Sequence, residues 1–102
     1  MNTYALEIVT VRGSADPAFL DRLAAAAYAV PALRNLHMGL NDDASVTAIF
    51  DLDADGPLAA AELGVQLFSA VIAAAKPLEH GRDSAVERFG VSSVTGRDLA
   101  PA

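Results

Sequence analysis

The chain has 102 residues, the commonest size of a single domain and enough to bury one hydrophobic core. Its 13 acidic and 7 basic residues give a net charge of −6, and the basic residues are spread along the chain, so binding to a nucleic-acid backbone is disfavoured. Cysteine is absent, which excludes disulfides, thiolate metal ligands and cysteine nucleophiles.

The chain is unusually apolar for its size. Hydrophobic residues make up 53% and the mean hydropathy is +0.33, so the surplus predicts a subunit interface. Residues 1–7 lack the basic start and unbroken apolar run of a signal peptide. The alanine-rich stretch 57–75 approaches membrane-spanning length, but Glu62 and Gln66 interrupt it. We therefore expect a soluble cytoplasmic protein that does not enter a membrane.

The first half of the chain predicts a strand, a helix and a second strand. Residues 3–12 alternate between two faces and are rich in β-branched and aromatic types, which indicates a strand. Asp16 and Pro17 then begin a helix, because an aspartate can accept the free amides of the first turn and proline suits the first helical position. Pro31 ends this helix, and residues 35–40 alternate again as a strand.

The second half repeats this order. Residues 46–53 predict a third strand that follows so closely on the second that the two form an antiparallel hairpin. A long helix begins at Pro57 and runs to residue 75, and its apolar arc is wider than one sheet face needs. A polar loop over 76–84 leads to a last strand over 85–95, in which Gly90 could mark a bulge.

The predicted order is strand, helix, strand, strand, helix, strand, which resembles the split βαβ, or ferredoxin-like, α+β arrangement. The resemblance implies a four-stranded antiparallel sheet with both helices on one face and with the first and third strands in the centre. We expect a single domain over 1–95 and a flexible tail over 96–102. Because this fold hosts many unrelated functions, it assigns no activity.

One candidate site is a calcium loop. The stretch from Asp51 through Asp53 and Asp55 to Glu62 matches the spacing of EF-hand oxygen ligands, with Gly56 at the sixth position. A strand rather than a helix enters it, however, and alternation favours Asp51 and Asp53 as solvent-facing strand residues and Asp55 as a helix cap. We expect no cofactor, with weak calcium binding as the alternative.

A second candidate lies on the sheet face that the helices leave open. Glu7, His37 and Asp51 should share this face, where a histidine near a carboxylate can act as a general base or a ligand. The ferredoxin-like resemblance implies that dimers packing such faces together can enclose a small-molecule cavity. A third candidate is the charged loop 79–83, which also fits an ordinary connection.

These observations favour a non-enzymatic module that self-associates, most simply as a dimer, and that could also bind another protein. The apolar residues expected to form the interface lie on the second helix or on the sheet: Val65, Phe68 and Ile72, or Val9 and Ile49. The alternative is a small dimeric enzyme or ligand-binding protein that uses His37, Glu7 and Asp51. No nucleophile elbow, phosphate-binding loop or dinucleotide fingerprint is present in the sequence.

Overall fold

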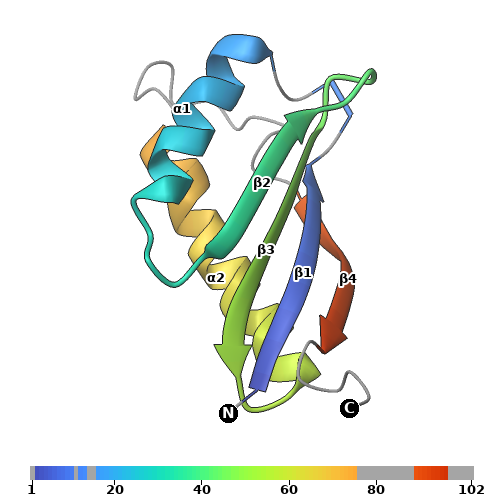
Figure 1. The fold of residues 1–102 in the computed structure, drawn as a ribbon. Helices are drawn as coiled ribbons and strands as arrows, with labels where there is room; N and C mark the ends of the chain where they lie inside the picture. Colours follow the sequence, from blue (N-terminus) through green and yellow to red (C-terminus); the bar gives the residue numbers. More distant parts are fainter. Residues whose placement is uncertain (1, 11, 14–15, 76–88, 97–102) are drawn as a thin grey trace.

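The fold is that of a computed structural model, which describes residues 2–10, 12–13, 16–75 and 89–96 (Figure 1). The elements are β1 (Asn2–Thr10), α1 (Pro17–Tyr28), β2 (Arg34–Leu40), β3 (Val46–Ala54), α2 (Pro57–Ala75) and β4 (Phe89–Gly96).

The four strands form one antiparallel sheet in the order β2-β3-β1-β4, with β1 and β3 in the centre (Figure 1). This confirms the ferredoxin-like α+β arrangement predicted from the sequence. The pairing of β1 with β3 is regular from Asn2 opposite Ala54 to Val9 opposite Thr47. The sheet is therefore most regular in its middle, where the two longest strands lie side by side.

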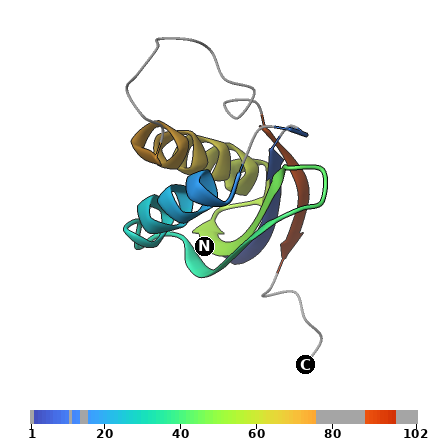
Figure 2. The same cartoon turned by 90° about the horizontal axis from the view of Figure 1, so that it is seen from above.

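Both helices cover the same face of the sheet, and Figure 2 shows them side by side in one layer. At the start of α1 the Phe19 amide donates a 2.8 Å hydrogen bond to Asp16 Oδ1, the cap predicted from the sequence. Both helices also make the same first backbone bond, from the Leu20 amide to the Asp16 carbonyl at 3.0 Å in α1 and from the Ala60 amide to the Gly56 carbonyl at 2.9 Å in α2. The residue before the proline is an aspartate in α1 and a glycine in α2, and Asp55 is exposed.

The core lies between the helices and the inner side of the sheet. Phe50 of β3 and Phe68 of α2 are fully buried, and the Phe68 ring meets Phe89 of β4 edge to face with centroids 5.1 Å apart. Gly64 lets α2 approach the sheet, because a Cβ at this position would lie 2.4 Å from Leu6 Cδ2. The small residue at 64 thus sets the spacing between α2 and β1.

The two edge strands depart from the predicted pattern. In β2 the register shifts between Arg34 and His37, and Asn35 has a left-handed backbone with φ 52°. In β4 the irregularity is at Ser92, because Val91 faces Ile8 while Ser93 faces Glu7. The bulge is therefore not at Gly90.

The end of β4 also corrects the predicted tail. Gly96 pairs with Tyr4 and so extends the strand by one residue beyond the predicted end, because the ladder with β1 continues to that position. Residues 85–88 of the predicted strand and 97–102 of the predicted tail lie outside the described residues.

α2 is long and apolar enough to cross a membrane by length and composition alone, with 19 residues and a mean hydropathy of 1.8. The core helix of a soluble domain passes the same test. In this fold α2 packs its inner side on the sheet through Phe68, Val71 and Ile72, as such a core helix does.

Candidate functional site

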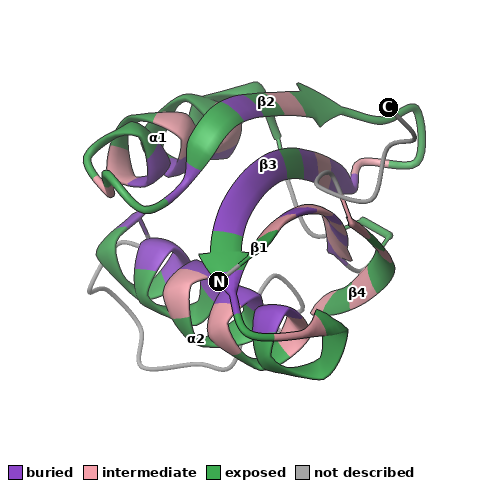
Figure 3. Ribbon diagram, turned by 60° about the horizontal axis from the view of Figure 1, so that its bottom comes forward, coloured by how far each residue is buried: buried purple, intermediate pink, exposed green. Residues whose placement is uncertain are grey.

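The side of the sheet opposite the helices is called the open face below. Burial alternates along β1 (Figure 3). Every second residue therefore faces the core, and the others face the open face. The paired residues of the open face are Thr3, Ala5, Glu7 and Val9 of β1, Arg34, His37 and Gly39 of β2, Thr47, Ile49, Asp51 and Asp53 of β3, and Gly90, Ser93 and Thr95 of β4.

A single row across the open face contains two of the predicted site residues. Glu7 of β1 and His37 of β2 both pair with Ile49 of β3, so the three side chains stand in line on one side of the sheet. Neighbouring strands are ~4.8 Å apart, which puts the backbones of Glu7 and His37 ~10 Å apart with Ile49 between them. The predicted placement on one face is correct, but the histidine and glutamate of one chain do not form a direct pair.

Ile49 is the most notable apolar residue of this row. It lies on a central strand, yet 38% of it is exposed. Its diagonal neighbours on β1 are Ala5 and Val9, which are half-buried. Diagonal side chains on neighbouring strands are close enough to touch when they are large. The middle of the open face is therefore an apolar patch formed by Ile49, Val9 and Ala5, interrupted by Glu7.

Glu7 is held by a residue that the sequence did not single out. The Ser92 hydroxyl donates to Glu7 Oε1 at 2.5 Å and lies 3.2 Å from the Glu7 carbonyl oxygen. Ser92 is the extra residue of the β4 bulge, so the bulge turns its side chain onto β1. The sequence could have revealed this contact only through the position of the bulge. Gly90 suggested a bulge at residue 90, whereas it lies at Ser92.

Asp51 is buried, with 8% exposure, although alternation predicted a solvent-facing residue. Its Oδ2 accepts a 2.8 Å hydrogen bond from Asn35 Nδ2. Asn35 adopts the left-handed backbone at the register shift of β2, a conformation that asparagine tolerates better than most residues. Asp51 is therefore a positioned carboxylate in a polar corner of the open face.

Asp53 belongs to a neighbouring contact at the same end of the face. Its Oδ1 accepts hydrogen bonds from the Thr3 hydroxyl at 2.6 Å and from Arg34 at 2.5 Å. The Thr3 hydrogen bond, followed by the Arg34 charge, lowers the pKa of Asp53 below its ordinary value. This group is solvent-exposed, since the Arg34 and Asp53 side chains are 49% and 47% accessible.

The predicted calcium ligands are not gathered around a common point. β3 runs through Ala54, so Asp51 and Asp53 lie on an extended strand, while Glu62 lies within α2. An EF-hand loop has to turn around its ion. In the described part of the chain, no group of three or more His, Cys, Asp or Glu residues is arranged to hold a metal ion.

The structure also changes the predicted interface on α2. Phe68 and Ile72 are 0% and 3% exposed and belong to the core of the chain, because the apolar arc of α2 is wide enough to reach both the central strands and the edge strand β4. Val65 remains on the outer side with 39% exposure, and Leu58 is 73% exposed near the start of the helix. Glu62 lies between these two residues, so they do not form a continuous patch.

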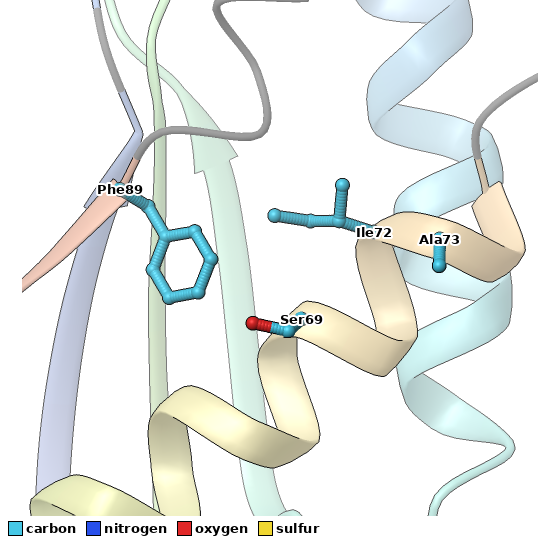
Figure 4. Close-up of a pocket in the computed structure, with 4 residues that line it drawn as sticks. All are labelled: Ser69, Ile72, Ala73 and Phe89. Atoms are coloured by element: carbon cyan, nitrogen blue, oxygen red, sulfur yellow. The ribbon is translucent and has the colours of Figure 1, made fainter. Parts of the chain in front are cut away.

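A shallow pocket of about 120 Å³ lies between α2 and β4. Figure 4 shows Phe89 pointing toward the helix, with Ser69 and Ile72 on the facing side. Among the described residues that line the pocket, no two are titratable, and Ser69 is the one with a hydroxyl. The charged loop 79–83 lies outside the described residues.

No family model, no curated protein and no solved structure matches the chain. The function has to be argued from the geometry of the open face and of the helices.

Proposed function

We propose that the protein is a non-enzymatic module that forms a dimer through its open face. The observation that carries this proposal is Ile49, which exposes 38% of its surface in the middle of a central strand. An apolar residue at such a position loses its contact with water when a second surface covers it. A second copy of the chain offers the same apolar patch, and closed symmetric dimers are the commonest assembly of soluble proteins.

The open face supports the proposal better than the outer side of α2 does. On the sheet, Ile49 has Val9 and Ala5 as diagonal neighbours on the adjacent strand, with Glu7 between them. On α2, the burial of Phe68 and Ile72 within the chain leaves Leu58 and Val65 as separate exposed residues. Apolar side chains that lie next to one another exclude water when they are covered together, which separate residues do not.

The test is the mass of the particle in solution after one charge is placed on the patch. Ile49→Glu should turn the dimer into a monomer in sedimentation equilibrium, because a carboxylate would have to be buried in the interface. The far-ultraviolet circular dichroism should stay unchanged, since residue 49 is exposed in the single chain.

The matched control is Val65→Glu, which adds the same charge at a position of similar exposure on α2. This variant should remain a dimer. If it becomes a monomer while Ile49→Glu does not, the interface lies on the helix instead. A wild-type protein that stays monomeric up to ~500 µM, far above the micromolar range of weak complexes, contradicts the proposal.

A second candidate function is the binding of a small molecule on the open face, with or without catalysis. The observation favouring it is that Glu7 and His37 flank Ile49 while Asp51 is held nearby by Asn35. A positioned carboxylate near a histidine suits recognition of a polar ligand. A thermal-shift screen of small polar metabolites tests this function, since a true ligand should stabilise the wild type and not Asp51→Asn.

The cytoplasmic location and the further protein partner expected from the sequence remain part of the proposal. The fold supports the coarser statement that the chain folds as a soluble domain, with α2 packed on the sheet. Fractionation of cells that express a tagged copy tests the location.

A further inference from the structure

We infer that β4 of one copy pairs with β4 of a second copy, antiparallel and edge to edge, about a two-fold axis between Ser92 and Ser93. This contact goes beyond the open-face dimer of the proposed function and does not depend on it. A two-fold axis perpendicular to the sheet joins the two four-stranded sheets into one continuous sheet. Both open faces then lie on the same side and stay uncovered by this contact.

β4 is an edge strand with little to block a further strand. It pairs with β1 on one side, and in the described part of the chain no strand pairs with its other side. It contains no charged residue and no proline, which commonly protect such edges. The other edge strand, β2, carries Arg34, and the Tyr28 hydroxyl of α1 donates to its Leu36 carbonyl at 3.3 Å. Of the two edges, β4 is therefore the one open to pairing.

The bulge at Ser92 decides which strand fits this edge. From Phe89 to Gly96 the exposure reads intermediate, exposed, intermediate, exposed, exposed, intermediate, exposed, intermediate, because the bulge places two exposed residues in succession. A regular strand alternates without a break, so it matches the faces of β4 on only one side of the bulge. The pattern of β4 is the same in both directions, so an antiparallel copy matches on both sides. A second copy of this chain is therefore the occupant that fits.

The axis also sets the pairs of inward side chains. Phe89 lies opposite Gly96 of the partner subunit, and Val91 lies opposite Val94 of the partner subunit, each pair twice by symmetry. The three apolar side chains are only half-buried in the single chain, whereas the inward residue Ile8 of β1 is fully buried. Pairing covers the half-buried side chains, and the glycine leaves room for the ring of Phe89.

The pairing brings no like charges together within β4, because this strand has none. The nearest charged side chain on the open face is Glu7, which pairs with Ser93 from the next strand. Its two copies are separated by three strand spacings, ~14 Å, which exceeds the ~8 Å screening length at physiological salt. In the sequence, one acidic and one basic residue precede the strand at 87 and 88, and another such pair follows at 97 and 98. Neither end therefore adds net charge.

The contact is small. Eight residues at ~3.3 Å per residue and a sheet thickness of ~10 Å give ~260 Å² per copy, about a third of the ~800 Å² of a standard interface. We therefore expect this contact alone to be weak, with a dissociation constant in the millimolar range. Each open-face dimer has two β4 edges, so the two contacts together should assemble particles larger than a dimer at high concentration.

The first experiment uses Ile49→Glu as the background, because this change removes the open-face contact and leaves β4 intact. Its amide NMR signals are followed from ~0.1 to ~5 mM, on either side of a millimolar dissociation constant. The signals of β4 should shift with concentration, and those of β2 should stay in place. Shifts confined to β2 and β3, or no shifts at all, overturn the inference.

The second experiment tests the register through Gly90 and Thr95, which lie opposite each other across the axis. Both are exposed, and a Cβ at Gly90 would meet nothing within 4 Å, so charged side chains fit at both positions. Within one chain the two positions are ~16 Å apart along the strand, too far for an ion pair. Gly90→Glu with Thr95→Lys, added to the Ile49→Glu background, places opposite charges across the contact twice. The dissociation constant should fall ~2- to 30-fold, as expected for two cross-strand ion pairs.

Gly90→Lys with Thr95→Lys is the matched control in the same background. It makes the net charge less negative, which alone would tighten any dimer, yet it places like charges across this contact. The dissociation constant should therefore rise at least ~2-fold. If this variant instead tightens the dimer, net charge and not the register decides, and the inference is overturned. Because every variant carries Ile49→Glu, a failure of the open-face dimer does not affect this test, and a failure of the β4 contact leaves the proposed function standing.

Discussion

Thr3 and Asp53 show how a single hydroxyl tunes an exposed carboxylate. The Thr3 hydroxyl donates to Asp53 at 2.6 Å and is the largest cause of the lowered pKa of Asp53. Because the pKa is lower in the folded than in the unfolded chain, the contact stabilises the fold at a pH above the ordinary aspartate value. That contribution is lost as the pH falls through the lowered value.

Thr3→Val should therefore raise the pKa of Asp53, and unfolding in acid should begin at a higher pH than in the wild type. Carboxyl-carbon NMR titration measures the pKa directly, and circular dichroism against pH follows the unfolding. Asp43 provides an internal control, because a hydrogen bond from Ser45 is the largest cause of its own lowered pKa. If the Asp53 titration is the same with and without Thr3, the hydrogen bond is not what lowers its pKa.

At the same scale, Asp51 shows what a sequence pattern cannot predict. Alternation along β3 correctly placed Asp51 on the open face beside Ile49 and Asp53. Its burial depends on Asn35, a residue 16 positions away whose left-handed backbone brings its amide onto the carboxylate. The alternation of residues along a strand predicts which side of the sheet a residue faces. It does not predict which side chain of a neighbouring strand will cover that residue.

At the scale of elements, the bounds of α2 were predicted correctly. Phe68 and Ile72, however, were expected on the outer side of the helix. Phe68 and Ile72 are buried, because α2 contacts β4 as well as the central strands. A helix that is apolar over a wide arc does not reveal from its own sequence which part of the arc meets the sheet. Gly64 does mark this part, since a Cβ at residue 64 would overlap the side chain of Leu6 on β1.

Gly64→Ala tests this close approach. An added methyl would meet Leu6 Cδ2 at 2.4 Å, and Leu6 is 1% exposed with little room to move. Overpacking of this kind costs ~1–3 kcal/mol, and the better helix propensity of alanine offsets ~1 kcal/mol, so we expect a net loss of up to about 2 kcal/mol in urea unfolding.

Leu6→Val combined with Gly64→Ala should be less destabilising than the sum of the single changes, because the shorter side chain makes room for the methyl. Ala70→Gly on the exposed side of α2 should cost ~1 kcal/mol through helix propensity alone. A Gly64→Ala variant more stable than the wild type would show that α2 is not in close contact with Leu6.

At the scale of the whole molecule, the order of the elements was sufficient to predict the sheet. Two helices that each begin at a proline one or two residues after an aspartate, separated by a tight hairpin, leave few ways to connect four strands. The bulge at Ser92 and the register shift before His37 were not predicted, because both depend on pairing between strands that are distant in sequence. These irregularities position the side chains of Glu7 and Asp51, so the fold was more predictable than the site.

The net charge affects the dimer as a whole. Each copy has a charge of −6, so a dimer has a total charge of −12 and its two copies repel each other. Raising the salt from ~10 mM to ~150 mM shortens the screening length from ~30 Å to ~8 Å, which weakens repulsion across the molecule more than attraction between contacting groups. The dimer should therefore become tighter by about two- to fivefold over this range.

Glu62→Gln separates the two electrostatic effects, because Glu62 is exposed on α2, and this helix lies on the side of the sheet opposite the open face. The variant has a net charge of −5 (−6 plus the one negative charge removed) and leaves the residues of the open face unchanged. Its dimer should be tighter than the wild type at low salt and should respond less to added salt. A wild-type dimer that weakens steadily with salt would instead mean that attraction at the interface exceeds the repulsion between the two acidic copies.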